Sequence, residues 1–93
     1  MRTIERTTQF KKDYKREAKG RHRASLSSDL VIVLDLLAND RRLGSSYRDH
    51  GLSGEWHDFR DCHLKPDLVL IYRKPDKARL QLVRLGSHSE FGW

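Results

Sequence analysis

Residues 68–73 read Leu-Val-Leu-Ile-Tyr-Arg, and in an extended strand both faces of this run would be apolar. Leu70 and Tyr72 fall on one face, and Val69 and Ile71 fall on the other. A strand that is apolar on both faces is typical of the centre of a sheet, where it is covered on both sides. Residues 68–73 are therefore expected to be the central strand of the fold.

Two further runs flank this strand and turn signals separate them from it. A strand is expected over residues 56–63, followed by a turn at Lys65-Pro66. A third is expected over residues 78–85, after a turn at 74–77 whose second residue is Pro75, which suits a type I turn. Short connections of this kind join antiparallel neighbours. The second half of the chain is thus predicted to be a three-stranded meander.

The first half of the chain favours one short strand and two helices. Residues 2–6 suit a strand, and a helix follows Thr7 or Thr8 and ends near Lys19. Residues 25–39 have the apolar periodicity of a helix, and the apolar stripe is wide enough to suggest packing on more than one side. The Gly- and Ser-rich stretch 40–55 suggests an irregular loop. The order β-α-α-β-β-β predicts a single α+β domain over residues 1–93, with two N-terminal helices packed on a small antiparallel-rich sheet.

The positive charge of the chain is concentrated at its N-terminus. Residues 1–23 hold nine basic and three acidic side chains, which accounts for the whole net charge of +6, since the other 70 residues are balanced. Such a patch attracts polyanions by neutralising phosphates and releasing counterions. The alternative is a solvated helix face that only keeps the protein soluble. The density of the patch favours contact with nucleic acid or the ribosome.

The cysteine content and hydropathy indicate a cytoplasmic protein. Cys62 is the single cysteine, so an internal disulfide is impossible, and a lone thiol suits a reducing compartment. No apolar run approaches the roughly 18 residues of a membrane span, and the N-terminus has no apolar leader segment. We expect no contact with a membrane.

Strand order predicts that three polar side chains meet at one edge of the meander. His63 ends its first strand, Asp67 begins its second, and His88 lies just beyond the end of its third. In an antiparallel meander the end of one strand lies beside the start of the next. His50 lies in the preceding loop, and the pattern of strands does not place it.

Two histidines and a carboxylate suit the cleavage of RNA. RNA supplies its own nucleophile, the 2′-hydroxyl, and histidine can take and give protons near neutral pH. Asp67 could orient a histidine, while Arg60 and Arg84 could support the phosphate. The alternative is a metal site formed by His63, Asp67 and His88, but their spacing matches no specific metal signature. We therefore expect neither a metal nor another cofactor.

Several motifs in one order resemble a known family. They are Tyr47-Arg48-Asp49-His50-Gly51-Leu52, Gly54, Trp56, Arg60-Asp61, His63, Pro66-Asp67, Leu70-Ile71-Tyr72 and Arg84-Leu85-Gly86-Ser87-His88-Ser89-Glu90. With these motifs the chain resembles the YafQ type of the RelE/ParE toxin superfamily over nearly its whole length. The order of elements derived above agrees with the fold of that superfamily.

The resemblance implies a toxin of a bacterial type II toxin–antitoxin system. Such toxins enter the ribosomal A site and cut mRNA without a metal ion, and a cognate antitoxin of the DinJ type blocks them. The toxin–antitoxin complex is expected to bind operator DNA through the antitoxin. The implied catalytic residues are His50, His63, Asp67, His88 and Phe91. Ribosomal RNA or mRNA is expected to meet Lys11, Lys12, Lys15, Arg16, Lys19, Arg60 and Arg84.

Two other functions fit the same chain. A ParE-like toxin would inhibit gyrase on the same fold without catalysis, but it is not expected to need a histidine cluster. A basic RNA-binding module would bind RNA in a salt-dependent way without cutting it. The histidine cluster favours the ribosome-dependent endoribonuclease over both.

Overall fold

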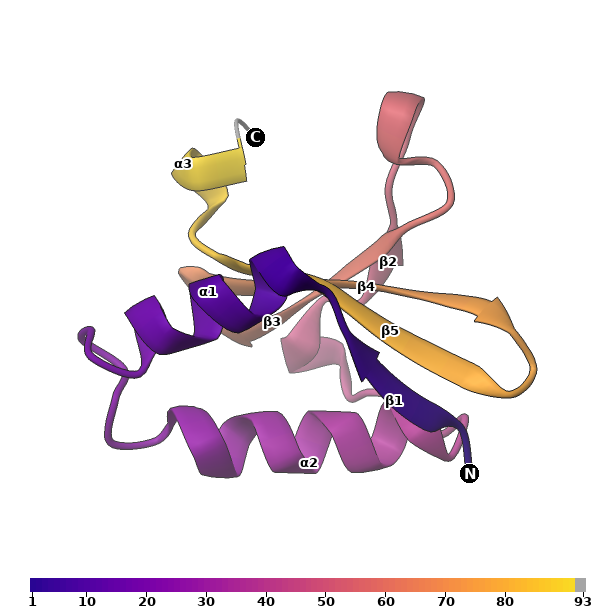
Figure 1. Ribbon diagram of the computed structural model, residues 1–93, viewed down its shortest axis with the longest axis horizontal. Helices are drawn as coiled ribbons and strands as arrows, with labels where there is room; N and C mark the ends of the chain where they lie inside the picture. Colours follow the sequence, from indigo (N-terminus) through magenta and orange to yellow (C-terminus); the bar gives the residue numbers. More distant parts are fainter. Residues whose placement is uncertain (92–93) are drawn as a thin grey trace.

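The computed structural model describes residues 1–91 and confirms the α+β fold (Figure 1). The strands are β1 (Thr3–Arg6), β2 (His50–Gly51), β3 (Arg60–Lys65), β4 (Leu68–Asp76) and β5 (Arg79–Gly86), and the α-helices are α1 (Thr8–Glu17), α2 (Leu26–Ala38) and α3 (His88–Phe91). Two 3-10 turns, η1 (Ser45–Tyr47) and η2 (Gly54–Trp56), flank β2. The predicted meander is β3-β4-β5, with strand ends that differ from the expected ones by up to four residues.

The five strands form one mixed sheet in the order β1-β5-β4-β3-β2. β4 is the middle strand, as its two apolar faces predict. It pairs antiparallel with β3 and β5, whereas β1 pairs parallel with β5. The hairpin from β4 to β5 closes between Asp76 and Arg79, so Pro75 lies in the end of β4 and not in the expected turn. The β4 ladder is irregular there, which fits a residue without a backbone N–H.

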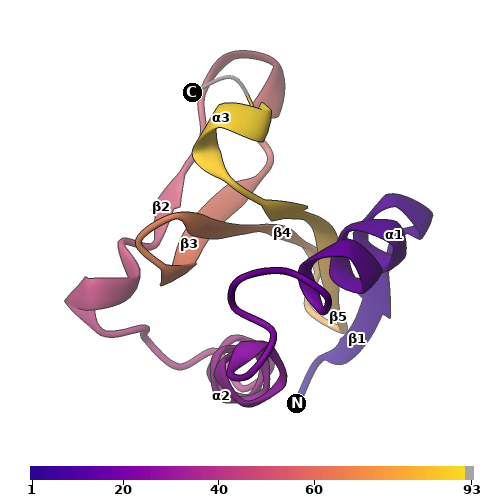
Figure 2. The ribbon, with the colours of Figure 1, turned by 90° about the vertical axis from the view of Figure 1, so that its left-hand side faces the viewer.

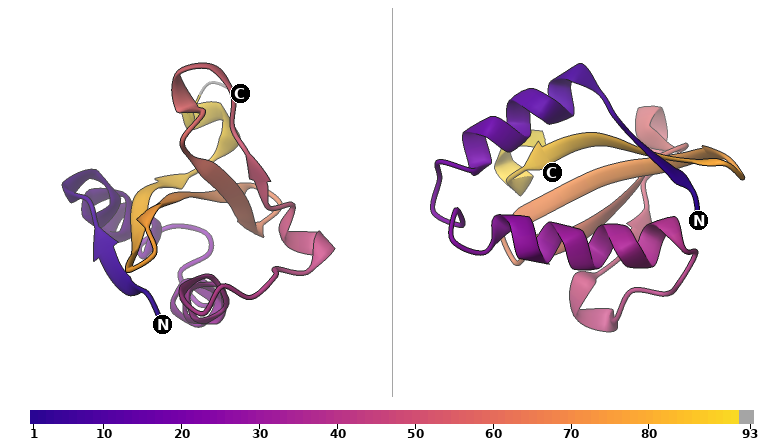
Figure 3. Two further views of the ribbon diagram at one scale, coloured as in Figure 1. Left: turned by 90° about the vertical axis from the view of Figure 1, so that its right-hand side faces the viewer. Right: turned by 60° about the horizontal axis from the view of Figure 1, so that its bottom comes forward.

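The two long helices cover one face of the sheet (Figures 2 and 3). Thr7 caps α1 by accepting a hydrogen bond from the backbone N–H of Phe10 at 3.0 Å. Phe10 and Val33 pack with Leu70 and Tyr72 in the core, and all four are at most 2% exposed. The core therefore lies between the helices and alternate residues of the central strands.

The outer side of α2 differs from the prediction. Val31 and Ile32 are 63% and 52% exposed, so this helix is packed along one stripe only. Two neighbouring exposed apolar side chains on a helix mark a candidate contact surface.

The other face of the sheet carries polar residues. Cys62 and Leu64 of β3 point into the core, so Asp61 and His63 point the opposite way, in register with Ile71 and Val69 of β4. Figure 1 shows α3 and the segment between β2 and β3 on this side, away from α2. None of the helices within residues 1–91 is long and apolar enough to cross a bilayer.

Candidate active site

His63 and His88 lie in contact, as the strand order predicts. Their Nε2 atoms are 3.2 Å apart, and the rings meet edge to face with centroids 4.7 Å apart. His63 comes from β3 and is 6% exposed, while His88 begins α3 just after β5. The fold thus holds two imidazoles within hydrogen-bond distance of each other on the face of the sheet that points away from α2.

A backbone carbonyl fixes the tautomer of His63. Its Nδ1 lies 3.3 Å from the carbonyl oxygen of Pro66, which can only accept a hydrogen bond, so Nδ1 carries a proton. In the neutral ring Nε2 is then an acceptor, and His88 Nε2–H donates to it. The pair thus offers one ring nitrogen that can accept a proton and one that can donate a proton, the two functions that acid–base catalysis needs.

His50 joins the site through a strand that the sequence pattern does not predict. The stretch expected to be an irregular loop contains β2, in which His50 pairs with Asp61 of β3. His50 Nδ1 donates to the carbonyl oxygen of Arg48 at 2.8 Å and lies 3.0 Å from Asp61 Oδ1. Its side chain is 57% exposed, so Nε2 is free to meet a ligand.

Asp61 is the residue of this site that the sequence analysis does not single out. Its side chain is fully buried, and within the described residues neither carboxylate oxygen receives a hydrogen bond. Burial raises the pKa of Asp61, and the nearby charges of His50, His63 and His88 act in the opposite direction. The alternation of Asp61 with His63 along β3 is the signal that could have found it.

The loop that carries His50 is anchored to the sheet. Asp49 accepts a hydrogen bond from the hydroxyl of Tyr72, a core residue of β4 that is 1% exposed. Its other oxygen accepts a hydrogen bond from Arg60 at 3.2 Å. Arg60, expected to contact RNA, is thus partly engaged in holding the residue before His50.

Asp67 does not contact either histidine of the pair. Its carboxylate binds His22 at 2.8 Å and Arg21 at 3.0 Å, both in the connection between α1 and α2. The hydrogen bond from His22 lowers the pKa of Asp67. The Asp67 side chain therefore points toward the α1–α2 connection and not toward the His63–His88 pair. The turn that carries Asp67 still serves the pair, because its Pro66 carbonyl binds His63.

Arg84 and Phe91 lie together beside α3. The Arg84 guanidinium is 5.1 Å from the centre of the Phe91 ring, and it binds both Asp13 of α1 and Glu90 of α3. Arg16 of α1 binds Glu90 as well. Arg84, expected to support a phosphate, and Arg16, expected to contact RNA, thus meet carboxylates in the free protein.

The lysines of α1 and of the segment after it are exposed. In the described part of the chain no ion pair involves Lys11, Lys12, Lys15 or Lys19. Their charges are available to an external anion, as the N-terminal charge density predicts.

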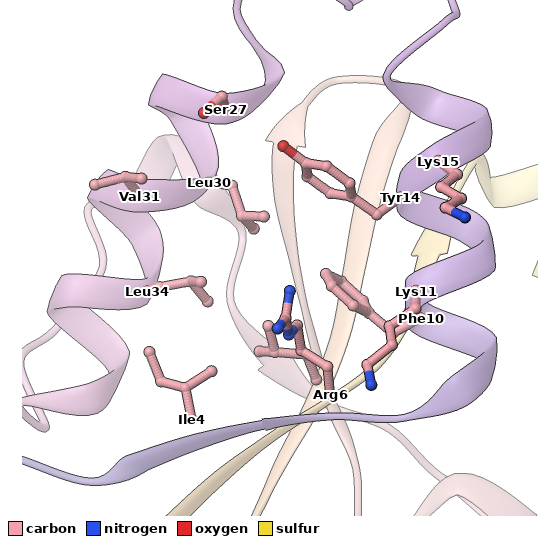
Figure 4. A pocket seen from close by; sticks show the side chains of 11 residues that line it. Ile4, Arg6, Phe10, Lys11, Tyr14, Lys15, Ser27, Leu30, Val31 and Leu34 are labelled. Atoms are coloured by element: carbon pink, nitrogen blue, oxygen red, sulfur yellow. The ribbon is translucent and has the colours of Figure 1, made fainter.

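Two small hollows adjoin the histidines, and a larger cavity lies elsewhere. Cavities of about 310 Å³ and 290 Å³ include His63 and His50, respectively, in their walls. A groove of about 750 Å³ lies between α1 and α2 (Figure 4). Its lining is mainly apolar, with Phe10, Tyr14 and Val31, and it carries Arg6, Lys11 and Lys15. The walls of the groove contain no His, Asp or Glu side chain, so it is a candidate contact surface.

A metal site is not apparent in the described chain. Residues 1–91 bring together no group of three or more His, Cys, Asp or Glu side chains that could hold a metal ion. His63, Asp67 and His88, the alternative ligand set, are divided because the Asp67 carboxylate binds His22 and Arg21.

Known proteins match the chain over nearly its whole length. The family profile "Bacterial toxin of type II toxin-antitoxin system, YafQ" matches residues 2–92. The mRNA interferase toxin YafQ of Escherichia coli K12 is 39% identical over 88 residues, which cover 95% of this chain and 92% of that protein.

Solved structures of toxins have the same fold as this chain. YafQ in the E. coli DinJ-YafQ complex is 33% identical, with a TM-score of 0.80 and full coverage of both chains. A metal-bound toxin from Helicobacter pylori is 44% identical, with a TM-score of 0.80, and the match covers 97% of this chain and 98% of that one. The chain therefore belongs to the YafQ family of bacterial toxins of type II toxin–antitoxin systems.

Proposed function

We propose that this toxin is a ribosome-dependent endoribonuclease that cuts mRNA in the ribosomal A site, in the cytoplasm, by histidine chemistry without a metal ion. The observation that carries the proposal is the His63–His88 pair, whose Nε2 atoms lie 3.2 Å apart. The name of the E. coli relative, an mRNA interferase, supports the same substrate.

The reaction needs two proton transfers and one charge to be stabilised. His63, held with a bare Nε2 by the Pro66 carbonyl, takes the proton of the 2′-hydroxyl, and the 2′-oxygen attacks the adjacent phosphorus. His88, protonated, gives its proton to the departing 5′-oxygen. The products are a 2′,3′-cyclic phosphate and a free 5′-hydroxyl, so protons and charge balance.

His50 and Asp61 serve the phosphate in this scheme. The exposed side chain of His50 donates from Nε2 to a phosphate oxygen, and buried Asp61 orients the ring from 3.0 Å on the side of Nδ1. A positive donor fixed in place stabilises the charge that develops on the pentacoordinate phosphate. Asp67 and Phe91 are proposed to meet the RNA from opposite sides of the pair, Asp67 from the β3–β4 turn and Phe91 from α3.

Contact with the ribosome is proposed for the basic face of α1. Lys11, Lys12 and Lys15 are exposed and have no ion pair among residues 1–91, and Lys19 continues the same patch. Phosphates of ribosomal RNA would release counterions when these lysines bind, which favours association at low salt. The exposed lysines are the observation that supports the proposed contact with the ribosome.

Mapping mRNA 5′ ends after brief induction tests the proposal. Cuts are expected at one fixed position of the codon, only within translated regions, with a 5′-hydroxyl on the downstream fragment. Cuts that ignore the reading frame, or that occur equally in untranslated RNA, would contradict ribosome dependence. Translation that stops while mRNA stays intact and DNA supercoiling changes would support the gyrase-inhibitor alternative instead.

The proposed protein partner is an antitoxin of the DinJ type, as in the E. coli complex. We propose the groove between α1 and α2 as part of its seat. The apolar lining and the exposed Val31 suit the apolar face of a helix, and Arg6, Lys11 and Lys15 suit acidic residues along its edges. The complex is proposed to bind operator DNA through the antitoxin.

Replacing Val31 by aspartate is expected to weaken neutralisation by the cognate antitoxin. The change places a charge in the apolar groove, and we expect the affinity to fall at least about tenfold. Co-expression with the antitoxin measures the effect as lost rescue of growth, and titration of the purified proteins gives the Kd. Ser28→Asp, on the same helix outside the groove, is the matched control. Equal rescue of both variants would place the antitoxin elsewhere.

A further inference from the structure

The carboxylate of Glu90 is enclosed by two arginines from different elements. Arg16 of α1 donates from Nη1 and Nη2 to its two oxygens, at 2.8 Å each, and Arg84 of β5 donates from Nη2 to Oε2 at 3.0 Å. Glu90 itself lies on α3, two residues after His88. One guanidinium binds this planar anion bidentately, and a second guanidinium also donates to it. Arginines that bind a phosphate present the same set of donors.

The two arginines are held in place from behind, without Glu90. Asp13, which is fully buried, accepts a hydrogen bond from Arg84 Nε at 2.8 Å and one from the backbone N–H of Leu85 at 3.0 Å. Burial alone would raise the pKa of Asp13, but these bonds outweigh it and lower the pKa. Arg16 Nη2 also donates to the carbonyl oxygen of Leu85 at 2.9 Å. The cationic pair is therefore a built feature of the fold that outlasts the removal of Glu90.

The seat of Glu90 depends on the absence of a side chain at Gly86. A Cβ at this position would stand closer to Glu90 Oε1 than real Cβ atoms come to any atom. The atom displaced would be the far end of a flexible side chain, so the strand itself could remain. Gly86 thus leaves room for an anion against the end of β5, between the two arginines.

We propose that Arg16 and Arg84 form a subsite for a backbone phosphate of the bound RNA strand, and that Glu90 occupies this subsite in the free protein and competes with RNA for it. The subsite adjoins the cleavage site, because His88 and Glu90 share one short helix and Phe91 stacks on Arg84. This inference rests on the proposed nuclease function for the identity of the ligand. It assigns Glu90 as a carboxylate that the substrate must displace.

Binding of an uncleavable strand tests the subsite. The probe is a short fluorescent single-stranded DNA, which has the same phosphodiesters as RNA but no 2′-hydroxyl, and anisotropy gives the Kd. Glu90→Gln is expected to tighten binding about fivefold, because the phosphate no longer displaces a carboxylate. It should also increase the slope of log Kd against log salt concentration by about one. In the variant the phosphate displaces a bound counterion from the arginines, whereas in wild type it displaces the Glu90 carboxylate.

Two further variants separate this effect from net charge. Glu5→Gln removes the same charge from an exposed pair with Arg79 and is expected to tighten binding less, with no change in slope. Adding Arg16→Gln to Glu90→Gln is expected to abolish the gain.

The contrary result is equally clear. If Glu90→Gln binds the probe no tighter than Glu5→Gln, or more weakly, while its circular dichroism melting curve shows that it is folded, Glu90 is a structural tie for α3 and the subsite is wrong. The probe needs neither ribosome nor cleavage, so this outcome is independent of the nuclease proposal. Tight, Arg16-dependent binding by a chain that leaves mRNA intact would retain the subsite and reject the nuclease.

Discussion

Replacing His88 by alanine is expected to lower the rate of mRNA cleavage on the ribosome by about a thousandfold, which is within the range for loss of one general acid or base. His88 Nε2 is the partner of His63 Nε2, so the variant loses the proton donor for the departing 5′-oxygen. The ring of His88 is partly exposed at the start of α3, and its loss should leave the core intact. Cleavage in a single turnover with ribosomes programmed with a defined mRNA gives the rate.

His57→Ala is the matched control for this prediction. His57 is 72% exposed, directly follows η2 and does not belong to the His63–His88 pair. Its ring binds the backbone carbonyl of Gly54 and the neighbouring Asp58. Its removal should change the rate less than about threefold, because surface substitutions away from a site have small effects. The double variant His63→Ala/His88→Ala should be little slower than either single one, since the two rings act as a unit. Full activity of His88→Ala would reject the histidine-pair mechanism.

Strand order alone could bring His63 and His88 together, because the ends of antiparallel neighbours must meet. It could not decide the direction of the Asp67 side chain. Asp67 lies in the turn between β3 and β4, where alternation along a strand does not apply. Its partners His22 and Arg21 lie in a connection that has no periodic signal. The carboxylate near the pair is Asp61, which alternation along β3 places on the same face as His63.

Other features depend on contacts that leave no mark in a local pattern. β2 has two residues, too few for an alternation to be seen, and its pairing with β3 places His50 beside Asp61. The wide apolar stripe of α2 predicted burial on more than one side. Hydrophobicity alone, however, does not distinguish a helix face that packs in the core from an exposed face that could bind a partner. The exposure of Val31 and Ile32 is thus a result of the structure. The engagement of Arg84 with Asp13 and Glu90 is likewise tertiary, since Asp13 is 71 residues away in the chain.

Asp61→Asn should show whether the buried carboxylate serves catalysis or stability, because the two roles predict opposite results. The carboxylate is fully buried and receives no hydrogen bond within residues 1–91, so its ionised form is costly to bury. Burial raises the pKa of Asp61, so the folded state binds its proton more tightly than the unfolded state does. Wild-type stability therefore falls as pH rises from 3.8 through the raised pKa, and the stability of Asp61→Asn relative to wild type should rise over the same range.

The rate of cleavage should move the other way. Without the carboxylate 3.0 Å from His50 Nδ1, the contact that orients the His50 ring is lost, and we expect Asp61→Asn to cut mRNA about a hundredfold more slowly. Asp58→Asn, which removes the same charge from an exposed pair with His57, is the control for rate and for stability. A variant that unfolds more easily than wild type at pH 7 and cuts mRNA at the wild-type rate would show that Asp61 supports the fold alone. A stable, slow enzyme would show that the carboxylate is kept, at a cost in folding energy, for its contact with His50.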